Sequence, residues 1–195
     1  FLDNLAYQIS DTSRYTDSKN LRLGYEWTTD YVKKFSDHED RELRLAFQLG
    51  GDISDQDNLV YQDYIDGSPT DSIINKNDGS PLSYTYQLDY THPLNDKHTI
   101  EAGAKYINRN LVNDYSTLQG TSYLQPLEQF DYTQNVASLY LSTKWELTKK
   151  WGAVVGLRAE NTQITGQWNS KIDDSWLINS KGQFENEYTT LLPSF

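Results

Sequence analysis

Three histidines are the first side chains of this sequence to test for metal chemistry. They are His38, His92 and His98, and the last two flank the same expected turn. A zinc site takes about four ligands from His, Cys and carboxylate side chains. The chain has no Cys, and no carboxylate cluster completes such a set around the histidines. We therefore expect solvated turns and no metal site, with a metal pair at His92 and His98 as the alternative.

Clustered carboxylates are the second candidate for binding a cation. The clusters are Asp52 with Asp55 and Asp57, Asp173 with Asp174, and Asp78 within an Asn-Asp-Gly turn. Calcium favours several oxygen ligands at close spacing, but none of these runs matches its twelve-residue loop. Asp and Asn are also common turn formers. We expect solvated loops here, with calcium as the alternative.

No catalytic constellation is visible in the chain. There is no Ser in a G-x-S-x-G elbow and no Gly-rich phosphate loop after a strand. The absence of Cys excludes thiol catalysis and disulfides. A net charge of −11 without a basic stripe argues against nucleic acid as a partner. The sequence therefore predicts neither an enzyme nor a cofactor.

The elements that carry these residues show a strict period of two. Apolar and polar residues alternate over six stretches, which are 21–28, 43–50, 82–90, 100–106, 137–145 and 151–160. Alternation of this kind indicates strands with one apolar face. The apolar positions carry no charge, and lipid is the solvent that enforces this rule most strongly, since a charge in the middle of a barrel wall costs about 2–4 kcal/mol. The chain also has no apolar run of the ~20 residues that a membrane helix needs.

The expected connections alternate between short and long. Short turns are expected at 33–40, 92–97 and 146–150, and long polar loops at 52–80, 111–128 and 166–187. Outer-membrane barrels have short periplasmic turns and long extracellular loops. The first, third and fifth strands should therefore run towards the periplasm. Trp145 and Trp151 bracket one short turn, where amphipathic rings favour the membrane interface.

Together these patterns predict an all-β protein, namely an antiparallel up-and-down transmembrane β-barrel. The chain would supply a partial arc of about six to seven strands, with a seventh strand starting near Tyr188. We expect residues 1–195 to be one portion of a single outer-membrane barrel domain. The sequence starts at Phe1 without a recognisable signal peptide or plug, so we expect an internal piece of a longer protein.

Four motifs, in order along the chain, resemble a known family. Leu-Asp-Tyr-Thr-His-Pro-Leu from Leu88, followed by Ile-Glu-Ala-Gly-Ala-Lys-Tyr from Ile100, resembles a D-Y-x-x-P…E-x-G-x-K hairpin. The other three motifs are an aromatic-led strand over 130–140, a G-x-R-x-E-x-T strand over 156–162 and a Y-x-x-L-x-P-S segment over 188–195. The set is similar to the C-terminal barrel portion of the TonB-dependent receptor-like outer-membrane β-barrel family common in Bacteroidetes. The likeness covers residues 88–195, whereas the part before Gly51 fits only in alternation and spacing.

This resemblance implies a large barrel of about 22 strands around a plug, in the outer membrane of a Gram-negative cell. It implies energised uptake of a bulky nutrient. The implied partners are outer-membrane lipid, the remainder of the barrel and its plug, a TonB-type energising protein and a surface lipoprotein. The alternative is a secreted, soluble β-sheet module that binds glycans through exposed Tyr and Trp.

Two sets of candidate site residues follow. Candidates for facing the lumen or contacting a plug are Arg44, Glu101, Lys105, Arg109, Arg158 and Glu160. They would line the substrate path or form a structural charge ladder, and we favour the ladder because a plugged lumen needs a polar wall. Candidates for extracellular ligand contact are Tyr61, Tyr64, Tyr115, Tyr123, Trp168 and Trp176, because aromatic rings in loops suit recognition.

Overall fold

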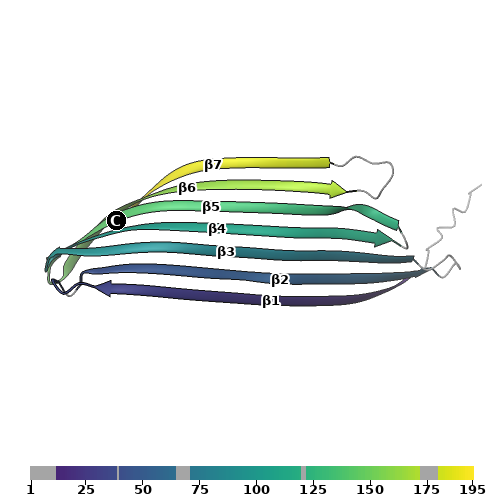
Figure 1. Cartoon of the computed structure of the whole chain (residues 1–195), viewed down its shortest axis with the longest axis horizontal. Coiled ribbons are helices and arrows are strands. Elements are labelled where there is room, and N and C mark those ends of the chain that lie inside the picture. Colours follow the sequence, from purple (N-terminus) through teal and green to yellow (C-terminus); the bar gives the residue numbers. More distant parts are fainter. Residues whose placement is uncertain (1–11, 39, 65–70, 120–121, 172–179) are drawn as a thin grey trace, which may run out of the picture.

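Seven antiparallel strands, each paired with its neighbours in sequence, form one sheet in the order β1 to β7 (Figure 1). The computed structural model describes residues 12–38, 40–64, 71–119, 122–171 and 180–195. The strands are β1 (Thr12–Lys34), β2 (Glu42–Tyr64), β3 (Asp71–Asn95), β4 (His98–Gln119), β5 (Ser122–Thr148), β6 (Trp151–Lys171) and β7 (Ser180–Ser194). The predicted all-β, up-and-down arrangement of about six to seven strands is confirmed. Among the described residues β1 and β7 are not paired with each other, so the sheet is an open arc.

Three short turns lie at one end of the sheet, at the left of Figure 1. They span 35–41, 96–97 and 149–150. Each turn is fixed by local hydrogen bonds: the Phe35 amide donates to the Arg41 carbonyl at 3.1 Å, and the Lys97 amide donates to Asn95 Oδ1 at 3.0 Å. Within the described part of the chain, no helix is long and apolar enough to span a bilayer.

The expected long loops were wrong in extent. Most of 52–80 and 111–128 continues the strands, so that only 65–70 lies between β2 and β3 and only 120–121 between β4 and β5. The described parts of 166–187 also belong to β6 and β7. The seventh strand likewise begins at Ser180 rather than near Tyr188. The outward face of these extensions mixes polar residues such as Asp55 and Asp78 with apolar ones such as Ile53, so no strict apolar alternation marks them in the sequence. Their backbone groups nevertheless pair, as between Asn58 and Asn75, because an antiparallel ladder needs only backbone hydrogen bonds.

The strand register puts all six apolar sets on one face of the sheet. A single row of directly opposite residues, for example, runs across β2 to β7 through Leu45, Leu88, Ala104, Leu139, Ala159 and Leu191. The alternate residues share the opposite face. We call these the outer and the inner face. A one-residue slip in any pairing would reverse the faces of that strand, so the shared face confirms the predicted alternation.

Gly103 on the inner face makes room for the ring of Tyr140, its direct partner on β5. A Cβ atom on Gly103 would lie 2.4 Å from Tyr140 Cζ. In its position over the glycine, the Tyr140 hydroxyl donates a hydrogen bond to the carboxylate of Asp89 on β3, which also accepts one from Gln87 Nε2 at 2.8 Å. The glycine therefore permits a contact that links β3 to β5 across β4.

We predict that Gly103→Ala destabilises the full-length barrel by about 1–3 kcal/mol, because the added methyl group displaces the Tyr140 ring. Gly50→Ala is the matched control on the same face, since its Cβ would meet only the Tyr25 carbonyl oxygen, at 3.7 Å. Urea unfolding of the purified proteins in detergent measures both effects. Equal unfolding midpoints for the two variants would contradict this role of Gly103.

Candidate functional site

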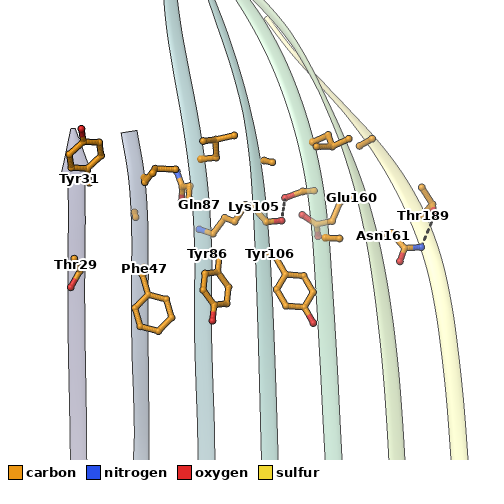
Figure 2. Close-up of a pocket in the computed structure, with 18 residues that line it drawn as sticks. Thr29, Tyr31, Phe47, Tyr86, Gln87, Lys105, Tyr106, Glu160, Asn161 and Thr189 are labelled. Atoms are coloured by element: carbon orange, nitrogen blue, oxygen red, sulfur yellow. Dashed lines mark hydrogen bonds between the residues drawn. The ribbon is translucent and has the colours of Figure 1, made fainter. Parts of the chain in front are cut away.

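The outer face carries a wide apolar groove across all seven strands. Its volume is about 870 Å³. Figure 2 shows Phe47, Tyr86 and Tyr106 next to one another on β2, β3 and β4. The Phe47 and Tyr86 rings lie 5.0 Å apart between centroids. Leu139 in the same groove is 68% exposed, so among the described residues nothing covers this apolar surface.

The apolar band crosses the sheet obliquely. On β3, Leu82 is the apolar residue of the band that lies farthest from the short turns. The row of directly paired residues that contains Leu82 crosses β4, β5 and β6 and ends on β7 at Glu185. The first apolar residue on the outer face of β7 is Leu191, which lies 191 − 185 = 6 residues further along over four strand steps. The border therefore shifts by about 1.5 residues per strand. Strands tilted by about 45° in a membrane give this shift, since they lie about 4.8 Å apart and rise about 3.3 Å per residue.

Aromatic and cationic side chains gather where the band meets the short turns. The Arg41 guanidinium lies 4.5 Å from the centroid of the Phe35 ring and donates from Nε to the Tyr90 hydroxyl at 2.8 Å. The His98 ring stacks on Trp145 with centroids 5.2 Å apart. Amphipathic rings favour the membrane interface. This edge of the sheet has the composition of an interfacial girdle.

The three histidines do not converge. His98 Nε2 lies 2.7 Å from Thr143 Oγ1, His92 Nδ1 lies 3.1 Å from the Tyr90 hydroxyl, and His38 Nδ1 accepts a 3.4 Å bond from the Asp40 amide. Within the residues that the structure describes, no group of three His, Cys, Asp or Glu side chains is placed to hold a metal ion.

All six candidates for the lumen lie on the inner face. The register alternates them with the apolar band, and they are Arg44 on β2, Glu101, Lys105 and Arg109 on β4, and Arg158 and Glu160 on β6. The structure brings Lys105 and Glu160 into one row on either side of Ser138. It leaves Arg44 and Arg109 in separate places.

Local ion pairs and hydrogen bonds occupy most of these groups. Arg44 pairs with Asp30 at 2.8 Å, and Arg158 pairs with Glu160 at 2.6 Å. Arg109 Nη1 donates to Gln134 at 3.0 Å. Exposed pairs of this kind contribute only about 0–1 kcal/mol each. Their geometry fits a charge ladder on a wetted wall.

Five of the six aromatic candidates for ligand contact lie on strands rather than in loops. Tyr115 and Trp168 are on the inner face, whereas Tyr61 is on the outer face, where its ring lies 6.4 Å from that of Tyr15. Tyr64 and Tyr123 lie at strand ends whose side chains are outside the described part, and Trp176 lies outside the described residues.

The two faces exchange polarity beyond the apolar band. On β5 to β7 the outer face becomes polar, with Thr133, Thr165 and Glu185 in one row. The inner face there carries aromatic residues that sequence reasoning missed, which are Phe130, Tyr132 and Phe184. These residues alternate in step with Tyr140 and Arg158. If the period of two is continued beyond the apolar stretches, it assigns all three aromatic residues to the inner face.

Three carboxylates form one row on the outer face beyond the apolar band. Asp55, Asp78 and Asp114 are direct neighbours on β2, β3 and β4. Partial burial and the charge of Asp55 raise the pKa of Asp78 above its ordinary value. Lys76 lies 3.7 Å from Asp57 and offsets part of the negative charge. Asp52 instead pairs with Arg22 at 3.2 Å, and Asp173 and Asp174 lie outside the described residues.

We predict that Leu141→Arg lowers the stability of the full-length barrel by about 2–4 kcal/mol, because Leu141 lies in the middle of the apolar band. Ser142→Arg is the matched control, since the neighbouring residue projects to the polar inner face. Unfolding in lipid vesicles, followed by the gel shift on boiling, measures the difference. A larger loss for Ser142→Arg would show that the faces have been assigned the wrong way round.

We predict that Asp78→Asn raises the urea midpoint at pH 7. A folded-state pKa above the unfolded value means that ionised Asp78 destabilises the fold, and that protonation removes this cost as pH falls. The gain should therefore disappear near pH 3. Asp131→Asn is the control, because Asp131 faces Val112 and Gln167 instead of another carboxylate. A gain from Asp78→Asn that is the same at both pH values would argue against charge repulsion.

Sequence comparison agrees with this geometry. The profile of the outer membrane protein β-barrel family matches residues 33–195, which is 195 − 33 + 1 = 163 of the 195 residues. A search of the curated proteins finds no match to the chain. The matched residues include all of β2 to β7, and with these strands most of the apolar band and of the inner face. This chain therefore belongs to the outer membrane protein β-barrel family, and its seven strands are barrel wall in the outer membrane.

Proposed function

We propose that this wall belongs to a TonB-dependent receptor-like importer that takes up a bulky nutrient across a Gram-negative, Bacteroidetes-type outer membrane. The observation that carries the proposal is the inner face, which is polar, exposed and hollowed. Such a face suits a wide lumen through which a large solute can pass.

Two hollows on the inner face support a wide lumen. One has a volume of about 590 Å³, and its lining includes Gly24, Gly50 and Arg109. The other has a volume of about 500 Å³, and its lining includes Tyr140 and Arg158. The interiors of small barrels are filled by their own side chains, whereas large barrels enclose channels or plugs. Side chains that leave such hollows fit the large class.

The open edges of the sheet support a longer barrel wall. Among the described residues, the outer edges of β1 and β7 have no paired strand. Unpaired backbone groups are not tolerated in lipid, so further strands must continue the wall on both sides. The open edges thus support the remaining strands as a partner, and the apolar outer face supports outer-membrane lipid. A plug inside the barrel, a TonB-type energising protein and a surface lipoprotein complete the proposal as partners that the resemblance implies.

The soluble glycan-binding module is not favoured. Such a module would have to bury Leu45 and Phe47 against a second layer. The described residues form one layer, and Leu45 is 43% exposed. The family match also supports a barrel wall. That the chain has no catalytic role remains part of the proposal.

We predict that deleting the complete gene in its native host abolishes uptake of one nutrient class, and that a protonophore stops uptake in the intact strain while surface binding persists. Energised import needs a gradient across the inner membrane, whereas passive diffusion does not. Growth on a panel of carbon and metal sources identifies the nutrient, and uptake of its labelled form gives the rate. Protonophore-resistant uptake would indicate a passive pore instead.

A further inference from the structure

We propose that the outer end of the inner face on β4 to β7 is a binding platform for the sugar rings of a neutral oligosaccharide. The inference rests on the proposed function, since it names the class of nutrient that such a wall would capture. It starts from four aromatic residues, Phe130, Tyr132, Trp168 and Phe184, which occupy two adjacent rows.

The rings lie flat because glycines sit beneath two of them. In one row Phe130 pairs with Trp168, and Trp168 pairs with Gly182. In the next row Tyr132 pairs with Gly166, and Gly166 pairs with Phe184. A Cβ on Gly182 would lie 1.8 Å from Trp168 Cζ2, and one on Gly166 would lie 2.1 Å from Phe184 Cε1. Each ring therefore rests on the backbone of the next strand.

The upper surfaces of these rings are free to make contacts. Trp168 is 44% exposed and Phe184 is 42% exposed. The Phe130 and Tyr132 rings are nearly parallel, with an interplanar angle of 25° and centroids 6.4 Å apart. From the strand spacing and rise, the four rings span about 10 Å across β5 to β7 and about 7 Å along the strands. This is a flat apolar surface large enough for sugar rings.

The platform cannot serve the lipid. It lies beyond the apolar band, and the outer face at the same level carries Asp131, Gln167 and Gln183. Water therefore covers the outer side at this height, and the exposed aromatic surface faces the interior. An interior surface of this kind meets solutes that enter from outside.

Hydrogen-bonding groups border the platform on both sides. Gln134 and Asn186 lie in the row nearer the membrane, Glu128 lies in the row on the other side, and Asn113 on β4 stands at the end of the row of Phe130 and Trp168. A sugar ring has an apolar C–H face and hydroxyl groups around its edge, so it needs an aromatic surface framed by amides and carboxylates. A lipid tail or an apolar peptide would leave this polar frame without partners.

The platform has no excess of either charge. The charged residues of the inner face that flank it are Glu128 and Arg109, which have opposite signs, and Arg109 donates a hydrogen bond to the neutral amide of Gln134 at 3.0 Å. The fitting ligand is therefore a neutral carbohydrate.

The test uses the full-length protein in detergent, with the gel shift on boiling as proof of folding. Calorimetry measures binding of maltohexaose, cellohexaose, xylohexaose, mannohexaose and chitohexaose. We expect at least one of them to bind, with little dependence on salt because the ligand has no charge. Trp168→Ala and Phe184→Ala should each weaken that binding roughly tenfold or more.

Three further variants keep the result interpretable. Trp168→Phe should retain most of the affinity, since a flat ring remains. Gly182→Val should weaken binding although every ring is still present, because its side chain occupies the place of the Trp168 ring. Tyr25→Ala is the matched control, since Tyr25 covers Gly51 in the same way on the outer face, and it should leave binding unchanged.

Several outcomes would overturn the platform. They are the absence of binding to all five oligosaccharides, unchanged binding in both alanine variants, and tighter binding of a flat aromatic solute such as riboflavin. Energised uptake of a non-carbohydrate nutrient that does not need Trp168 would reject the platform and leave the proposed importer standing. Oligosaccharide binding that depends on Trp168, without energised uptake, would reject the importer alone.

Discussion

The antiparallel backbone ladder is the constraint on which the rest of this structure depends. A bilayer core supplies no water to an unpaired amide or carbonyl, so every spanning strand must be bonded on both sides. The six pairings between β1 and β7 are almost continuous, with register shifts only near Pro93, Thr117 and the turn after Glu146. Because the ladder fixes each residue opposite its partner, it also fixes which side chains share a face. The lipid surface, the charge ladder and the aromatic platform are all consequences of this register.

The same ladder serves two solvents along its length. Between the short turns and the upper border of the band, lipid lies outside and the lumen inside, so Leu141 faces outwards and Ser142 inwards. Further along the same strand, water lies outside, and Asp131 faces outwards while Tyr132 faces inwards. The phase of the alternation does not change between these levels. Only the polarity of each face changes: beyond the apolar band the outer face is polar and the inner face carries aromatic residues.

Glycines pair with aromatic residues at several levels of the sheet. Tyr140 covers Gly103 on the inner face, Tyr25 covers Gly51 on the outer face, and Trp168 covers Gly182 near the rim. A glycine in a strand is normally weakening, because it has no side chain to pack. A ring from the neighbouring strand supplies the missing contact and shields the backbone. At the rim, this arrangement also presents an exposed ring face to solutes.

The sequence by itself determined the class of fold and the two faces within the membrane. Strict alternation from Leu43 to Leu49 or from Ala137 to Trp145 can be read without coordinates, because a strand reverses its side chains at every residue. The charged candidates, such as Arg44 and Glu160, were placed on the inner face by the same rule. What only the tertiary structure decided was how far each strand continues and which residues face each other. Beyond the band neither face has to be strictly apolar, because both faces meet water. The sequence therefore shows no strict alternation there, and the extensions of β2 to β5 could not be predicted from it. Strand periodicity also says nothing about cross-strand partners, which depend on register; the pairing of Trp168 with Gly182, and of Asp55 with Asp78, therefore emerged only from the folded sheet.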